Sequence, residues 1–263
     1  MKSTLDQIED IKNHGYPLDF SNVFNHAFEN YKKIALYAGL MLLVFSIIFG
    51  IAVFGVIIAI YGAESMSKDF IQNIENQKLT YVQSIITTFS YGIFGALVGP
   101  FGAGFLKMAD CADRDEEFNA STIFYYYKAP YFAQIFTACF LIAIISNSIT
   151  SVLQSFDIKF LGVALSLLLS YFTCFVIPLI VFGKLNAIDS IKSSFIIVSK
   201  QPITILFLLI VGGIFSLIGG FACCIGIIFT VPFSYAMSYA LYYEILGIGE
   251  QKDSIDSIGQ PDL

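Results

Sequence analysis

Six long apolar runs constrain this chain more than any other feature of its sequence. They are Ile34–Gly62, Tyr81–Met108, Tyr131–Phe156, Phe160–Gly183, Ile203–Gly226 and Ile227–Leu246. A helix needs about 20 mostly apolar residues to cross the hydrocarbon core of a bilayer. Since each run is of that length or longer, the sequence predicts an all-α integral membrane protein with six transmembrane helices.

The composition agrees with a membrane protein and excludes several other classes. Of the 263 residues, 57% are hydrophobic and 13% are charged. In soluble domains, about 45–50% of the residues are apolar and about 25% are charged. A disordered protein is therefore excluded. The net charge of −6 argues against a nucleic-acid binder, because phosphate binding needs basic clusters. The cysteines lack the spacing of a disulfide framework; they are Cys111, Cys139, Cys174, Cys223 and Cys224.

The last two apolar runs are separated by only a short stretch around Gly226. A single helix over both runs would be about 66 Å long at 1.5 Å per residue, roughly twice the thickness of the hydrocarbon core. A tight helical hairpin is therefore the preferred interpretation, and one long bent segment is the alternative.

Positive charge is distributed unequally between the two sides that six spans create. One side carries Lys2, Lys12, Lys32, Lys33, Lys107, Arg114, Lys128, Lys184, Lys192, Lys200 and Lys252. The other side carries Lys68, Lys78 and Lys159. Because Lys and Arg concentrate in cytoplasmic loops, both termini are predicted to be cytoplasmic.

The spans pair into three units of similar design. An amphipathic stretch precedes each pair, with apolar residues at helical spacing in residues 20–31, 120–127 and 185–198. The second span of each pair carries a proline, which predicts a kink: Pro100, Pro178 and Pro232. We therefore predict a threefold repeat of interfacial helix, straight span and kinked span. The alternative is a set of only loosely similar hairpins.

The sequence predicts three parts along the chain. Residues 1–18 are predicted to form a polar segment with a short helix over 3–12, residues 19–246 the membrane domain, and residues 247–263 a mobile polar tail.

Two sets of residues in the spans are candidates for a function. Prolines at matching repeat positions can mark a transport path, but packing or helix shape is the preferred explanation for Pro100, Pro178 and Pro232. Small residues recur every four positions and predict close helix packing, with a homodimer face as the alternative. These small residues are Gly95, Gly99, Gly212, Ser216 and Gly220.

No catalytic residue, metal ligand or cofactor site is predicted. The spans contain almost no ionisable groups, which argues against a proton-coupled pump. Adjacent Cys223 and Cys224 have no further zinc ligand nearby in the sequence. His26 is expected at the membrane interface, and the acidic run that includes Asp113 and Asp115 is expected to be solvated rather than to bind a cation.

The last third of the chain resembles a known group of proteins. The segments FVIPLIVFGKLNAIDSIKSSFIIVSKQ and GGIFSLIGGFACCIGIIFTVPFSYAMSYALYYEIL, with Gly226, Thr230 and Pro232 near the start of the last span, are similar to uncharacterised six-helix integral membrane proteins of bacteria. These in turn are similar to the membrane domain attached to some glycerophosphodiester phosphodiesterases. The resemblance implies a multi-pass protein of the cell inner membrane. The phosphodiesterase domain is missing, so its activity is not implied.

Two functional expectations follow. The first is a non-enzymatic scaffold or subunit of an envelope membrane complex, with membrane lipids and other membrane proteins as partners and no nucleic acid. The alternative is a transporter or flippase for a lipid or small amphipathic solute. A packed centre between the kinked spans favours the scaffold, and a polar cavity between them favours transport.

Overall fold

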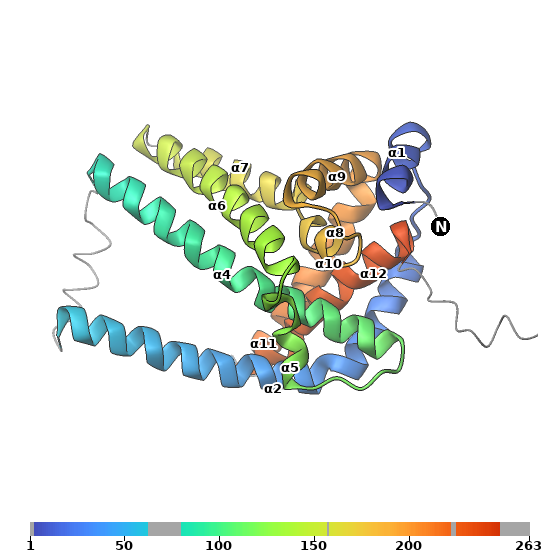
Figure 1. Ribbon diagram of the computed structural model, residues 1–263, viewed down its shortest axis with the longest axis horizontal. Helices are drawn as coiled ribbons and strands as arrows, with labels where there is room; N and C mark the ends of the chain where they lie inside the picture. The colour runs from blue at the N-terminus through green and yellow to red at the C-terminus, as the bar shows by residue number, and fades with distance from the viewer. Residues whose placement is uncertain (1–2, 63–79, 157, 222–224, 248–263) are drawn as a thin grey trace, which may run out of the picture.

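The computed structural model of the chain describes residues 3–62, 80–156, 158–221 and 225–247 (Figure 1). These residues form helices and no strand. Four segments are long and apolar enough to span a membrane: α2 (Phe20–Tyr61), α4 (Tyr81–Asp113), α6 (Tyr131–Ser155), and α7 (Lys159–Phe172) together with α8 (Val176–Val181). A fifth is counted if α9 (Ala187–Lys200) and α10 (Pro202–Ile218), which meet at an angle of 102°, form one span. The all-α membrane class is confirmed, whereas six spans stay a prediction.

A short helix, α1 (Thr4–His14), precedes the first long one. Ser3 and Asp6 form a capping box at its start, and it ends at Gly15, whose φ of 72° favours glycine. Ile8 and Ile11 are buried where α1 packs against α9. The N-terminal segment is thereby attached to the membrane domain.

The first predicted interfacial helix and the first span are one continuous helix, α2, of 42 residues. The prediction of a separate interfacial helix before the first span is therefore wrong for this unit. The physical reason lies in the sequence: the other two units have Pro130 and Pro202 two residues after their lysine, whereas no proline follows Lys33 in α2 and the next glycine is Gly39. Nothing in α2 stops the helix at the membrane interface.

The other two predicted interfacial helices differ from each other. Residues 120–127 form only a four-residue helix, α5 (Ala120–Ile123), and a 3₁₀ turn, η2 (Tyr125–Tyr127). The third is a full helix, α9, capped by Asn186 and bent sharply away from α10. The three units thus start in three different ways.

The three prolines also have different effects. Pro100 lies inside the uninterrupted helix α4. Pro178 is in the first turn of α8, after a break at residues 173–175, and Pro232 starts α12 (Pro232–Leu246) directly after α11 (Ile225–Thr230). A proline lacks the amide hydrogen that a helix interior needs, but it fits the first turn. The predicted span 160–183 is accordingly two helices, and the last span is broken at Val231.

The chain reverses direction between α10 and α12. A 3₁₀ turn, η3 (Gly219–Phe221), follows α10. The hydroxyls of Ser216 and Ser234 are 2.7 Å apart, and Gly212 lies next to Met237, so residues earlier in α10 face residues later in α12. This antiparallel arrangement excludes the single long bent segment.

The helices pack most tightly at one end of the bundle, which we call the charged end. There α2 starts, and α4 and α12 end (Figure 1). Helix α12 is central: Phe233, Met237 and Tyr239 are each at most 1% exposed, and α12 contacts α2, α4, α8 and α10. Lys32 and Lys33 lie in the first half of α2, and Lys107 and Arg114 lie at or just after the end of α4.

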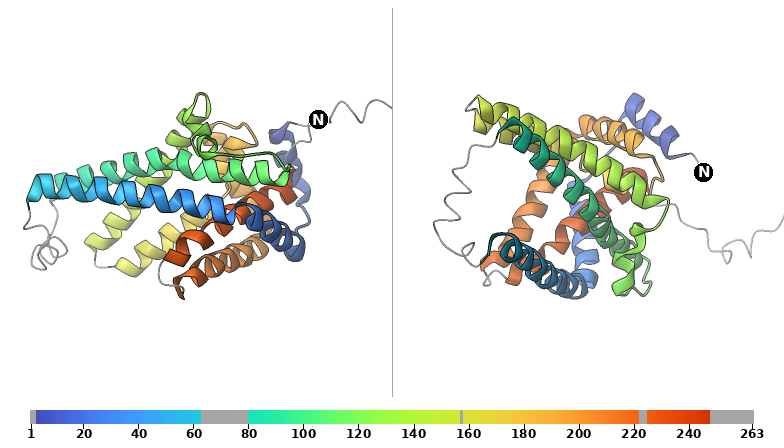
Figure 2. Two further views of the ribbon diagram at one scale, coloured as in Figure 1. Left: turned by 90° about the horizontal axis from the view of Figure 1, so that it is seen from below. Right: turned by 60° about the vertical axis from the view of Figure 1, so that its left-hand side comes forward.

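The opposite half of the bundle is open and apolar. The most apolar stretch of α2 has none of its residues buried within the chain. This half of α2 extends beyond α10, α11 and α12 (Figures 1 and 2). Exposed Ile51, Phe54 and Val56 cover it. Such a surface suits contact with lipid or with another apolar helix.

Candidate functional site

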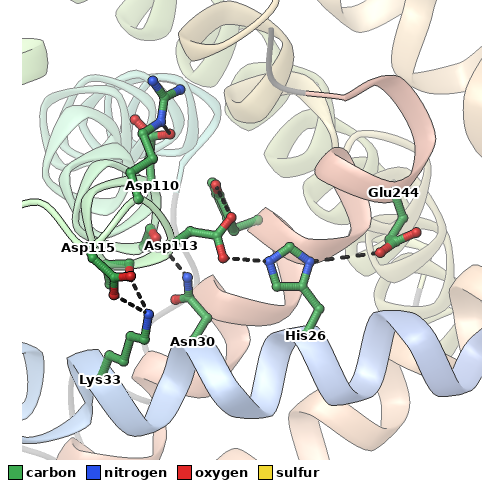
Figure 3. Close-up of polar contacts among 11 residues, drawn as sticks. His26, Asn30, Lys33, Asp110, Asp113, Asp115 and Glu244 are labelled. Carbon is green, nitrogen blue, oxygen red and sulfur yellow. Dashed lines mark hydrogen bonds and ion pairs between the residues drawn. The ribbon is translucent and has the colours of Figure 1, made fainter. Parts of the chain in front are cut away.

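A polar stripe runs along one face of α2 at the charged end. His26, Asn30 and Lys33 are four and three residues apart, so their side chains lie on the same face of the helix. This face packs against the last turn of α4 and against α12 (Figure 3). The three residues thus reach partners on two other helices.

His26 is the centre of this cluster. Its Nε2 is 2.9 Å from Asp113 Oδ1, and its Nδ1 is 3.9 Å from Glu244 Oε1 (Figure 3). The hydroxyl of Tyr239 donates to the other oxygen of Asp113 at 3.0 Å. The ring of Tyr243 meets the imidazole edge-on, with 4.9 Å between ring centroids. His26, Asp113 and Tyr239 therefore join α2, α4 and α12; we call these three residues the latch.

Asn30 and Lys33 bind the C-terminal end of α4. Asn30 is 2% exposed and donates to the Ala109 carbonyl at 2.7 Å. Lys33 Nζ donates to the Ala112 carbonyl at 2.9 Å and to Asp115 Oδ1 at 2.6 Å. The last carbonyls of a helix lack partners in the helix and carry partial negative charge, so an amide and an ammonium group stabilise this end.

A second carboxylate in the same turn of α4 is fully paired. Asp110 is 3% exposed. Lys107 Nζ is 2.8 Å from one of its oxygens, and Arg114 Nε is 3.0 Å from the other. A buried carboxylate is tolerated only with such partners, so the apolar part of α4 ends in a network of satisfied charges.

Both oxygens of the Asp113 carboxyl have a partner, since His26 Nε2 lies 2.9 Å from Oδ1 and the Tyr239 hydroxyl donates to Oδ2 at 3.0 Å. No serine or cysteine hydroxyl or thiol in the described part of the chain hydrogen-bonds to His26. In this region of the chain, no group of three or more potential ligands is arranged to hold a metal ion. The geometry is that of a link between helices.

A pocket of about 370 Å³ lies between α4, α6 and α7, away from the charged end. Its lining includes Gly95, Cys139, Ile142, Ala143 and Leu169. The polar part of the lining is uncharged and consists of Ser146, Asn147, Ser166, Ser170 and Thr173. The volume is at the lower end of the range for ligand pockets, about 300–1,000 Å³.

The structure places the three candidate prolines in the packed interior. Pro100, Pro178 and Pro232 are all buried, and α4, α8 and α12, which carry them, contact one another. Near Pro100, the hydroxyl of Tyr127 donates to the Leu97 carbonyl at 2.9 Å. The carbonyl that Pro100 itself leaves without a helical partner is the one four residues earlier, at Ala96. None of the three prolines lines the pocket.

Four of the five candidate small residues lie at helix contacts. A Cβ on Gly99 would be 2.8 Å from Cys139 Sγ of α6. Gly212 and Gly220 face α12 and α11, and the Ser216 hydroxyl bonds to the Gly212 carbonyl and to Ser234. Gly95 differs, because no atom lies within 4 Å of a Cβ built there and the residue lines the pocket.

Sequence reasoning missed most of the cluster and the pocket. The spacing of His26, Asn30 and Lys33 was a detectable signal, since these polar residues recur at helical spacing on a face beside the apolar stripe of residues 20–31. Gly104 was also missed; a Cβ there would overlap the Ile123 backbone of α5, so only glycine fits at this position. The pocket gave only the weak signal of Ser and Asn in apolar runs.

The comparisons with known proteins identify no relative of this chain. No family model matches the chain, and no curated protein or solved structure is significantly similar to it.

Proposed function

We propose that this chain is a non-enzymatic scaffold or subunit of a membrane protein complex. The observation that carries the proposal is α2, whose most apolar stretch has no residue buried within the chain. Gly50 and Gly55 lie in this part, and no atom lies within 4 Å of a Cβ built at either position. Small residues on a transmembrane helix allow another helix to approach closely.

The packed interior supports the same proposal. The helices that carry the three prolines contact one another around the buried side chains of α12. A path lined by three kinked spans needs space at this place, whereas a scaffold needs a rigid base. Fully buried Phe233 and Tyr239 make such a base.

The proposal includes the finer organisation that the sequence predicts. We take α10 as the fifth span and α11 with α12 as the sixth, and we take the three units as divergent repeats. The charged end is cytoplasmic in this proposal, because the rule for positive residues favours that orientation. The resemblance to bacterial six-helix proteins supports an inner-membrane location.

Photocrosslinking tests the scaffold. A photoreactive amino acid at Ile51 of α2 should join the full chain to one defined membrane protein in native membranes, whereas the same group at Ile214 of α10 should not. Replacing Gly50 and Gly55 by Leu should abolish the crosslink, because the larger side chains prevent close approach. Gly213→Leu is the matched control, since its Cβ position is also free of neighbours. A chain that stays alone in both cases contradicts the proposal.

Transport of a lipid or small amphipathic solute is the second candidate, because the polar pocket borders α4 and α7, two of the helices near the prolines. It predicts that Pro100→Ala, Pro178→Ala and Pro232→Ala together abolish lipid flux in proteoliposomes while the protein stays folded. Unchanged flux, or no flux of any tested lipid in the unmodified protein, argues against it.

A further inference from the structure

The polar side chains of the pocket lie deep in the apolar part of the bundle. Gly95 precedes Lys107, the first charged residue toward the charged end of α4, by twelve positions, which corresponds to about 18 Å along a helix. Asn147 is eight positions before the end of α6 at Ser155, or about 12 Å. The pocket is therefore at a depth where lipid chains, and not water, surround the bundle.

Three of these side chains have no hydrogen-bond partner among the described residues. Ser166 and Thr173 donate to carbonyls of their own helix, at 2.9 and 2.8 Å. No such bond is formed by the side chains of Ser146, Asn147 or Ser170. A carboxamide offers two donors and an acceptor oxygen, and a polar group without a partner in an apolar medium costs free energy. The pocket thus presents unused donors and acceptors.

The lining selects against charged ligands. No Asp, Glu, Lys, Arg or His borders the pocket. Moving a phosphate or an ammonium group into an apolar region without a counter-charge is strongly unfavourable. Hydroxyl groups, in contrast, can both donate to and accept from Ser and Asn side chains.

The rest of the lining is apolar. Cys139, Ile142 and Ala143 of α6 and Leu169 of α7 border the pocket. Acyl chains can lie against such side chains while a polar head group enters the pocket.

We propose that this pocket binds the hydroxyl-bearing head group of an uncharged lipid, with Asn147 as its main hydrogen-bonding side chain. Diacylglycerol is the simplest probe of this class. The inference does not depend on the scaffold proposal, since a scaffold subunit and a transporter can both hold a lipid.

The test uses the purified full chain in phosphatidylcholine nanodiscs with a small fraction of photoactivatable diacylglycerol. Labelled peptides should come from α6 and α7. Unlabelled diacylglycerol should compete, whereas phosphatidic acid with the same acyl chains, which differs only by its phosphate, should not. Free glycerol at the same concentration should not compete either, because it lacks the acyl chains.

Variants connect the labelling to the pocket. Asn147→Leu removes the amide, and Gly95→Leu fills the pocket from a position free of neighbours; each should reduce labelling about tenfold, the factor for one lost hydrogen bond of about 1.4 kcal/mol. Ser148→Leu is the matched control, since Ser148 is exposed and outside the lining. Thermal unfolding checks the fold, and Asn147→Leu should not lower the unfolding temperature. Unchanged labelling in the two pocket variants, or equal competition by phosphatidic acid or glycerol, would overturn the inference.

Discussion

At the scale of single residues, two serines of α9 show how a hydroxyl can be necessary or dispensable in the same surroundings. Both Ser190 and Ser194 are 0% exposed. Ser194 Oγ donates to the Phe172 carbonyl at 2.6 Å and accepts from the Phe175 amide at 3.2 Å. It thereby provides hydrogen-bond partners for the backbone carbonyl and amide at the break between α7 and α8. Ser190 Oγ has no partner among the described residues.

We predict that Ser194→Ala lowers the free energy of unfolding by about 1–3 kcal/mol, because it leaves a buried amide and a buried carbonyl without partners. Ser190→Ala should be neutral within about 0.5 kcal/mol, or stabilising, because it removes a hydroxyl that bonds to nothing nearby. Unfolding in detergent measures both values. Equal losses in the two variants would contradict this account of the α7–α8 break.

Residues such as Ser194 could not be found from the sequence. Its value depends on Phe172 and Phe175, which are about 20 positions earlier and on other elements. The helix interruption near Pro178 could be predicted, because a proline disrupts a helix through its own structure. The backbone groups at this interruption find their hydrogen-bond partner in a tertiary contact, which no local sequence pattern encodes.

At the scale of elements, the latch joins three helices that are far apart in the sequence. His26 belongs to α2, Asp113 to α4 and Tyr239 to α12. The side chains of His26 and Asp113 are 18% and 26% exposed, so water only partly screens their interaction. The latch therefore should contribute more than a surface ion pair.

A double-mutant cycle with His26→Gln and Asp113→Asn should give a coupling free energy of about 1–2 kcal/mol at neutral pH. The control cycle uses the exposed pair Glu29 and Lys32, for which about 0.3–0.5 kcal/mol is expected. Coupling no greater than in the control would refute the latch.

The elements themselves could be predicted better than their connections. The apolar runs located α4 and α6 within a few residues, because burial in lipid imposes a length that the sequence displays. The first interfacial helix was predicted as a separate element but is continuous with the first span, because charge alone does not stop a helix. The acidic residues near Asp113 were expected to be solvated, and their pairing with α2 and α12 depends on packing that periodicity does not specify.

At the scale of the whole molecule, the clustered charged side chains and the buried side chains around α12 lie at the same end of the bundle. The charged end combines the latch, the paired Asp110 and the buried side chains around α12. In the other half α2 extends apart from α4, α6 and α7, which stay in contact with one another (Figure 1). A bilayer accounts for this arrangement, since an apolar helix such as α2 needs no cover from other helices when lipid surrounds it. The central claim is that the charged end faces the cytoplasm.

Cysteine labelling in intact cells tests this claim most directly. In a cysteine-free background, single cysteines replace Arg114 or Lys192 at the charged end and Ile158 at the opposite end, all three at exposed positions. A membrane-impermeant thiol reagent should label only the Ile158→Cys protein from outside, and the other two only after the cells are opened. Labelling of position 114 or 192 from outside, with position 158 protected, would contradict the proposed orientation.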